Sequence, residues 1–382
     1  MLPRAPIWGL AVLGCVTIIP ILIGPVIVGV LIDSGGFTPA EAGLTAGYGA
    51  FGSVVIALVC ALTMHRLPLR RLALVGLVLA AAANAGAAFV YTDRTLFYAA
   101  RAVSALGEGA AYAAIMSAFA REEGSERCYG LFMMLQFGLA GVFLWALPTF
   151  APDLGVQTLY FSFATLQLVL LPIVLLLPTR AADVAGLSLR GSEWRLLFAL
   201  PALAGLVALC FSEASNIGTD AYLERIAMLA GLSDEEIGIS LGLASVLGMP
   251  GAFAILFVGS RFGHAVPVLF GFAVGTLSLI GIMAADSYAA FFVCTSIHSV
   301  AWAFVTPYIQ SVLADLDPGG AVVTAGGIAS GAGAGLGPAV AGSYVTEVDY
   351  SGVLTTSLAA FAIAAVAITI AARGIAAASP DR

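Results

Sequence analysis

An arginine and a glutamate interrupt an otherwise apolar stretch, "RAVSALGEGAAYAA", at positions 101 and 108. Seven residues correspond to about 700° of helical rotation, so both side chains lie on one helical face, with Cα atoms about 10.5 Å apart. Helical side chains lean toward the N-terminus, which turns Arg101 away from Glu108. A direct salt bridge within the helix is therefore disfavoured, and each group is expected to meet water, a neighbouring helix or a ligand.

These two residue types suit the binding of an anion together with a proton. The planar guanidinium of Arg101 can donate two parallel hydrogen bonds to a carboxylate. A carboxyl group in a partly dry cavity binds a proton more readily than it does in water. We therefore predict that Arg101 binds an anionic group and that Glu108 takes up and releases a proton. The alternative is a buried ion pair that holds neighbouring helices together.

Two other apolar stretches carry polar groups. In "FSEASNIGTDAYLER" (211–225), Glu213 is a second candidate for proton coupling and Asn216 a candidate substrate contact, with a helix break expected near Gly218. Asp220 is a weaker candidate for a functional role, because the outer end of that stretch is expected to be exposed to water. His298 and Trp302 lie four residues apart, and we predict that both contact the substrate. Ordinary core packing is the alternative for both.

The composition places these residues in a membrane. The 382 residues are 61% hydrophobic and 10% charged, and their mean hydropathy is +1.04, which excludes a soluble domain. The apolar start is too long for a cleaved signal peptide. A bilayer-spanning helix needs about 20 apolar residues, and twelve stretches qualify: 7–32, 40–63, 71–92, 95–120, 128–149, 156–178, 195–228, 236–258, 265–285, 288–314, 321–346 and 352–373.

The arginines predict the orientation, since all fifteen basic residues are arginine. One side of the twelve spans carries most of them, whereas the other keeps only Arg94 and Arg225. The positive-inside rule then places both termini in the cytoplasm, and we expect a multi-pass protein of the inner (cytoplasmic) membrane. The net charge of −7 argues against a nucleic-acid partner.

The sequence offers no catalytic or cofactor motif. The cysteines at 15, 60, 128, 210 and 294 lack metal-ligand spacing, and there is no glycine-rich phosphate loop. We therefore expect no enzyme activity, metal or cofactor, and a proton gradient as the driving force. The expected partners are a small, anionic molecule and the lipid bilayer, and the expected state is a monomer.

A repeat divides the chain. Residues 37–66 align without a gap on residues 232–261, at a constant offset of 195 that places Glu41 on Glu236. This predicts an all-α membrane protein of two six-helix halves, 1–180 and 195–382, joined by a cytoplasmic linker at 181–194. Parallel repeats of this kind are one known plan of transporters, with the substrate site between the halves.

With this plan, the chain resembles the major facilitator superfamily. In "ALTMHRLPLRR" (61–71), Arg66, Arg70 and Arg71 match the loop signature G-x-x-x-D-R-x-G-R-R/K, while His65 and Pro68 replace its Asp and second Gly. The resemblance implies twelve transmembrane helices, with spans 1, 4, 7 and 10 lining a central cavity. The charged residues described above fall in spans 4, 7 and 10.

The fourth span resembles a narrower pattern, R-x-x-x-G-x-x-E-G, of the anion:cation symporters, which include sialin-like carriers, and more distantly of spinster-like carriers. Arg101, Glu108 and Gly109 match it, whereas Ala105 replaces its first glycine. The first span lacks the acid that those symporters often carry. The resemblance implies an anion-contacting arginine and a proton-coupling glutamate.

Taken together, the sequence predicts a proton-coupled symporter that moves a small organic anion by alternating access. A proton antiporter that exports an amphiphile or drug is the first alternative, although span 5 lacks the glycine–proline pair usual in drug exporters. The second alternative is a non-transporting membrane protein on the same scaffold, and a channel suits the repeat and the buried acids least.

Overall fold

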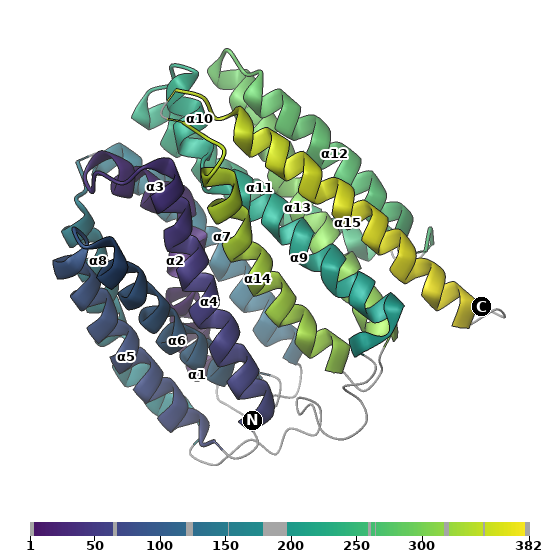
Figure 1. Ribbon diagram of the computed structural model, residues 1–382. Coiled ribbons are helices and arrows are strands. Elements are labelled where there is room, and N and C mark those ends of the chain that lie inside the picture. The colour runs from purple at the N-terminus through teal and green to yellow at the C-terminus, as the bar shows by residue number, and fades with distance from the viewer. Residues whose placement is uncertain are drawn as a thin grey trace.

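The computed structural model describes residues 4–63, 67–119, 125–151, 153–178, 197–258, 261–263, 265–316, 321–346 and 348–378. Across these residues the regular elements are helices, and ten of them are long and apolar enough to cross a membrane. The predicted linker 181–194 lies outside the described residues. The chain is a multi-pass, all-α membrane protein, and its helices form the bundle in Figure 1.

Each half of the bundle contains six crossings. The first half comprises α1 (Arg4–Thr17), α2 (Ile19–Leu22), α3 (Gly24–Asp33), α4 (Pro39–Thr63), α5 (Leu69–Val90), α6 (Arg94–Phe119), α7 (Ser125–Phe150), α8 (Val156–Val169) and the 3₁₀ helix η2 (Leu171–Leu176). The second half comprises α9 (Leu200–Asp220), α10 (Leu223–Leu229), α11 (Asp234–Val258), α12 (Ala265–Met283), α13 (Tyr288–Leu316), α14 (Ala321–Gly342) and α15 (Ser351–Ala378).

The aligned segments adopt the same structure. Helices α4 and α11 begin 195 residues apart and end 195 residues apart, as the alignment predicts. Before each helix a reciprocal capping box forms, in which a hydroxyl and a glutamate each accept a backbone N–H bond: Thr38 with Glu41, and Ser233 with Glu236. The constant offset therefore places equivalent helix starts in the two halves.

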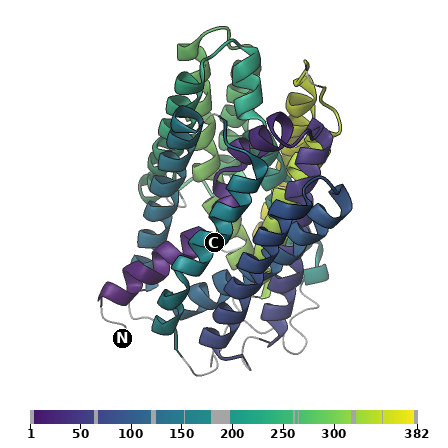
Figure 2. The same ribbon diagram turned by 90° about the vertical axis from the view of Figure 1, so that its left-hand side faces the viewer.

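Three crossings are interrupted, and the sixth changes at Leu170 from α8 to the 3₁₀ helix η2. Proline lacks the N–H that would continue a helix. Pro20 and Pro25 lie at the starts of α2 and α3 and break the first crossing. Its bent path is seen in purple in Figure 2. The seventh breaks at Ala221–Tyr222 rather than near Gly218 as predicted. A Cβ on Gly218 would lie 3.0 Å from backbone of Gly337, so this glycine allows close packing of α9 on α14 instead.

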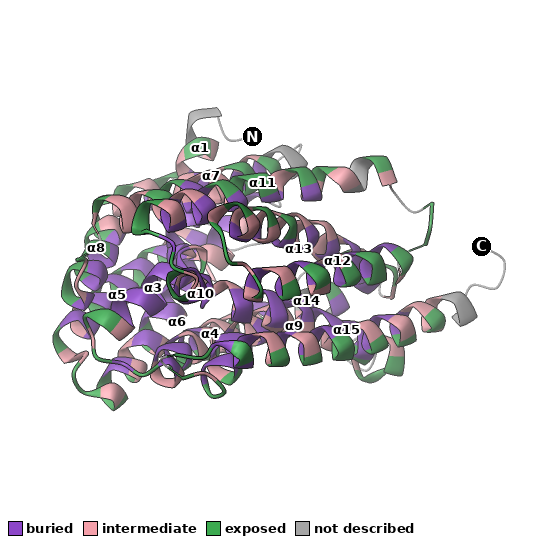
Figure 3. Ribbon diagram, turned by 90° about the horizontal axis from the view of Figure 1, so that it is seen from above, coloured by how far each residue is buried: buried purple, intermediate pink, exposed green. Residues whose placement is uncertain are grey.

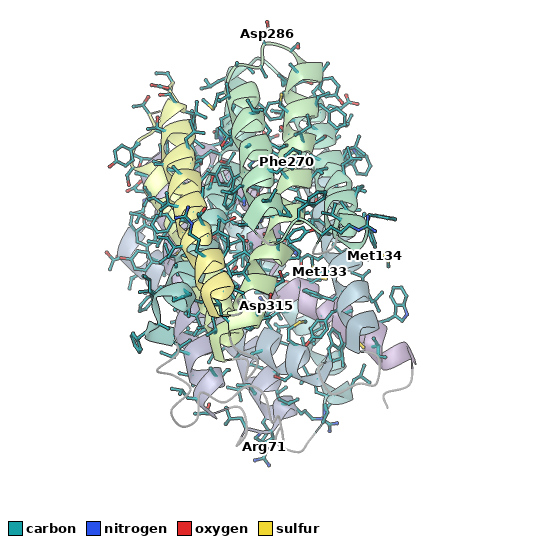
Figure 4. All side chains as sticks on the ribbon, turned by 90° about the vertical axis from the view of Figure 1, so that its right-hand side faces the viewer. Arg71, Met133, Met134, Phe270, Asp286 and Asp315 are labelled. Atoms are coloured by element: carbon teal, nitrogen blue, oxygen red, sulfur yellow. The ribbon has the colours of Figure 1, made fainter. Side chains whose placement is uncertain are left out.

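The exposed surface matches a lipid environment. Seen from above, buried residues gather along the inner faces of the helices and exposed residues surround them (Figure 3). Figure 4 shows the charged residues Arg71 and Asp286 at opposite ends of the bundle, with Phe270 between them. Phe270 is 65% exposed, as an apolar side chain facing lipid would be in an isolated chain. Three of the five cysteines, at 15, 60 and 128, are buried, and Cys210 and Cys294 are partly buried.

Among the described residues, the apolar core joins the halves at the α3–α10 end. One cluster of buried residues includes Val26 and Leu31 of α3 together with Tyr222 and Ile226 of the second half. The other two clusters each stay within one half, from Leu10 to Leu177 and from Ala202 to Ala371. Helix α3 accordingly packs on α9 and α10, while α1 packs on α6, α7, α8 and η2 of its own half. Within the part of the chain that the structure describes, the two halves therefore meet at the α3–α10 end and close the bundle there.

Polar contacts reinforce that closure. Arg225 of α10 donates two hydrogen bonds to the carboxylate of Asp33, at the end of α3. The hydroxyl of Tyr222 lies 2.9 Å from the carbonyl oxygen of Pro39 and 3.0 Å from that of Pro338, one in each half. The carboxyl group of Glu224 lies against Gly29 of α3, where a larger residue would displace it. The contacts that Arg225, Glu224 and Tyr222 make with Asp33, Gly29 and Pro39 of the first half must break if the α3–α10 end is to open.

The first prediction concerns this closure. Arg225→Gln removes the ion pair with Asp33, whose side chain is 57% exposed. The closed conformation then loses about 1 kcal/mol of stability relative to the open one. The fraction of molecules that are open at this end should therefore rise about fivefold. Spin labels at Asp153 and Asp286, in a background without native cysteines, report the distance by double electron–electron resonance. Arg94→Gln is the control, because Arg94 bonds within the first half. Equal distance distributions in both variants would contradict the prediction.

Candidate functional site

Arg101 and Glu108 are joined through side chains of two other helices. Nη1 of Arg101 donates to Oδ1 of Asn84 (2.9 Å) on α5 and to Oγ of Ser104 (2.7 Å). Nδ2 of Asn84 donates to Oε1 of Glu108 (3.0 Å) and lies 3.2 Å from Oε1 of Gln167 on α8. Nε2 of Gln167 also donates to Oε1 of Glu108 (3.0 Å). The expectation that the two charges do not pair directly is met, since an amide stands between them.

The side chains of Asn84, Arg101, Glu108 and Gln167 form a buried polar network inside the first half. Asn84 and Gln167 are fully buried, and Arg101 and Glu108 are each 5% exposed. Helices α5 and α6 approach closely here because Gly76 and Gly107 face each other's backbone. The short side chain of Asn84 can therefore reach both charged groups on α6.

Arg101 keeps unused hydrogen-bonding capacity. Its guanidinium carbon lies 5.4 Å from the centre of the Tyr160 ring on α8, and Nε has no hydrogen-bond partner among the described residues although it is buried. The buried hydroxyl of Tyr160 is also unpartnered there. Buried polar groups are rarely left unpaired, so these two call for water or a ligand.

The second half holds a separate polar group. Oε1 of Glu213 on α9 accepts a hydrogen bond from Thr306 (3.1 Å) and one from the indole of Trp302 (3.4 Å), both on α13. Glu213 is 5% exposed, whereas Trp302 and Thr306 are partly exposed. The structure thus brings together two of the residues predicted from the sequence, one on span 7 and one on span 10, and adds Thr306.

The other residues predicted from the sequence, Asn216, His298 and Asp220, make contacts outside these two groups. Nδ2 of Asn216 donates to the backbone oxygen of Ser212, one turn earlier in α9. His298 is buried and its Nδ1 lies 3.4 Å from Oγ of Ser278 on α12, so it does not join Glu213 and Trp302. Asp220, the last residue of α9, lies beside Gly24, where α3 begins, so the breaks of the first and seventh crossings face each other.

Sequence reasoning missed Asn84 and Gln167. Spans 3 and 6 contain no charged residue at mid-membrane, so charge gave no indication of a site there. A signal was nevertheless present, because each is a lone amide within an apolar stretch, "LAAAANAGAAF" and "FATLQLVLL". An amide buried in an apolar bundle needs a polar partner, and the charges of span 4 are the natural ones.

Comparison with known proteins identifies the family. Residues 9–342 match the family model of the Major Facilitator Superfamily. The chain belongs to this superfamily. No curated protein sequence matches the chain. The predicted anion:cation symporter branch is narrower than this family model and stays a prediction.

Solved structures of other transporters share the fold. A bacterial homologue of the human lysosomal transporter Spinster, in an inward-facing and unoccupied conformation, aligns at a TM-score of 0.71 with 14% identity, over 98% of this chain and 96% of the other. The nucleoside transporter NupG aligns at 0.73 with 14% identity, over 97% of this chain and 98% of the other. A point mutant of NupG aligns equally well, over 98% of both chains.

The second prediction tests the network's contribution to stability. Gln167→Leu removes one hydrogen-bond partner from Asn84 and one from Glu108 in a place that water does not reach, and the lost bonds cost about 1–3 kcal/mol. Thermal unfolding in detergent should occur at a lower temperature. Gln157→Leu is the matched control, since it makes the same change at an exposed position of the same helix. Similar unfolding temperatures for both variants would show that the network adds no stability.

Proposed function

We propose that this protein is a proton-coupled secondary transporter of a small organic anion. The observation that carries the proposal is the state of Arg101. Its Nη1 is linked through Asn84 to Glu108, and its Nε has no partner among the residues that the structure describes. An anion would supply the missing acceptor, and the unpartnered hydroxyl of Tyr160 would donate to it.

The signs of the charges favour symport. When Glu108 is ionised, its negative charge offsets that of Arg101 and opposes the approach of an anion. A proton on Glu108 removes that opposition, so Arg101 attracts the anion more strongly. By thermodynamic linkage, a bound anion raises the affinity of Glu108 for its proton by the same factor. The proton and the anion then cross the membrane together, and the transporter returns to its starting conformation with the site empty.

Closure at the α3–α10 end supports alternating access. We assign that end to the outer side, because the arginine distribution favours cytoplasmic termini, and the conformation is then inward-facing. The predicted halves, 1–180 and 195–382, are the bodies that would rock against each other. Helix α14 packs on α4, and α11 packs on α7, so these pairs form the surfaces along which the halves would move.

The group in the second half would complete the path. Glu213 faces Trp302 and Thr306 across the α9–α13 contact, and we assign it a secondary role in proton coupling. Trp302 is partly exposed and offers a flat surface to the substrate. Asn216 and His298 are weaker candidates for substrate contact, because each is buried against its own half.

The third prediction tests coupling. Proteoliposomes that contain a pH-sensitive dye receive lactate, benzoate or glucuronate, with uridine as a neutral comparator. We expect at least one acid to acidify the lumen with the wild type. Glu108→Gln, which resembles the protonated form, should still exchange that acid but move no protons. Glu235→Gln, at an exposed position, is the control and should behave as wild type.

Other outcomes of this assay favour other functions. Movement of an acid without protons would indicate a uniporter or exchanger, in which Glu108 has a structural role. Silence with every acid would favour export of an amphiphile or drug, and silence with amphiphiles as well would favour a non-transporting protein. Proton movement with uridine alone would contradict an anionic substrate.

The fourth prediction concerns the shape of the cation. Arg101→Lys keeps the charge but loses the planar fork, so we expect the affinity for the transported acid to fall about tenfold or more. Arg101→Met, which also removes the charge, should abolish binding. Uptake of the acid at increasing concentrations measures both effects. Wild-type affinity in the lysine variant would show that charge alone suffices, and wild-type affinity in Arg101→Met would exclude this residue from the site.

A further inference from the structure

Asn84 is the group that touches both charges at once. A guanidinium has only N–H donors, so the amide oxygen of Asn84 must face Arg101. Its NH₂ group must then face Glu108 and Gln167, as it does. The charges on α6 therefore fix the orientation of an amide that belongs to α5.

We infer that Asn84 is a positioning residue that transmits the protonation state of Glu108 to Arg101, and thereby sets how strongly proton binding and anion binding are linked. This inference rests on the proposed function. Asn84 need not touch the anion, because it acts through the hydrogen bond from Nη1 of Arg101.

An inserted amide has a different effect from a direct ion pair. A bidentate Arg–carboxylate pair would hold both charges in place and leave neither free for a ligand. With Asn84 between them, the charges attract across a polarisable group, and hydrogen bonds in such a chain strengthen one another. When Glu108 is protonated, Nδ2 of Asn84 has a weaker acceptor. Its Oδ1 then holds Arg101 less firmly, and the guanidinium is freer to bind an anion.

Gln167 holds Asn84 and Glu108 in their positions relative to each other. It donates to Oε1 of Glu108 and accepts from Nδ2 of Asn84, so the three side chains close a ring of hydrogen bonds. Both amides donate to Oε1 and neither to Oε2. We assign the proton to Oε2, since a proton there leaves both amide bonds in place.

Few other charged or titratable groups act on Glu108. Tyr160 on α8 interacts with Glu108, and Arg101 on its own helix is linked to it through Asn84. On the other helices that pack against α6, the titratable groups lie in other contacts or at the surface: Glu41 beside Arg94, Tyr48 stacked on Tyr98, Arg70 bonded to the backbone oxygens of Leu175 and Leu177, Arg71 exposed, Cys15 at Phe132, Cys60 and Cys128 in the apolar core of the first half, and Tyr129 bonded to Met116. The side chains of Arg4, Glu126 and Arg127 lie outside the described set.

The fifth prediction follows from Asn84→Leu, a change of similar volume. Leucine removes the donor to Glu108 and occupies the space through which Arg101 would otherwise approach it. Loss of a hydrogen bond to a charged group should raise the midpoint pH at which Glu108 protonates by about one unit, a tenfold change in proton affinity. Infrared difference spectroscopy measures this midpoint from the carboxylic C=O band of Glu108, obtained by subtracting spectra of Glu108→Gln.

A double-mutant cycle separates transmission from structural support. If Asn84 transmits, Arg101→Met should shift the midpoint strongly in the wild type and much less in the Asn84→Leu background. Asn84→Asp is a second, isosteric variant in case the leucine variant misfolds. It accepts from Arg101 but places a second acid beside Glu108, so it should also raise the midpoint. Gln157→Leu is the surface control and should leave it unchanged.

The outcomes distinguish this inference from the proposed function. If the wild type shows no titrating Glu108 band, the proposed proton site itself is wrong. If the band titrates normally and folded Asn84 variants keep the wild-type midpoint, or if Arg101→Met shifts it equally in both backgrounds, only the role of Asn84 is overturned.

Discussion

One charge of each sign inside a hydrophobic bundle constrains the helices around it. Each charge costs about 2.5–3.5 kcal/mol at the membrane centre, and the cost falls only when polar partners surround it. Here those partners are the amides of Asn84 and Gln167, which come from α5 and α8. Close packing of α5 on α6 at Gly76 and Gly107 brings the first amide within reach. The packing of the first half and the chemistry of its charges therefore depend on each other.

The position of this network suits a switch better than a binding pocket alone. Its members are buried within the first half, while the contacts that close the α3–α10 end lie between the halves. A change of charge at Glu108 would alter what Arg101 can bind without breaking the packing of that half. Closure depends instead on the apolar residues of α3 and α10 and on the Asp33–Arg225 pair. The main anion and proton groups, Arg101 and Glu108, would lie in one half, while access is controlled between the two halves.

The sequence predicted the fold well because its signals are local. Apolar length, arginine distribution and the 195-residue repeat indicate crossings and halves, and the capping boxes at Thr38 and Ser233 explain why the repeat is clearest there. The site was less predictable, since helical spacing shows which residues share a face but not which helix that face meets. Thus Glu213 and Trp302 come together, whereas His298 turns to Ser278. Asn84 and Gln167 were missed because uncharged amides stand out less than charges do.

Proton uptake on anion binding tests the central claim most directly. Purified protein in weakly buffered detergent solution, with a pH indicator, would receive the acid that moves in proteoliposomes. The account predicts that the wild type takes up close to one proton for each anion bound, near the pH at which Glu108 is half protonated, and that Glu108→Gln binds the anion with no uptake. Anion binding with no proton uptake by the wild type at any pH would contradict the linkage between Glu108 and Arg101.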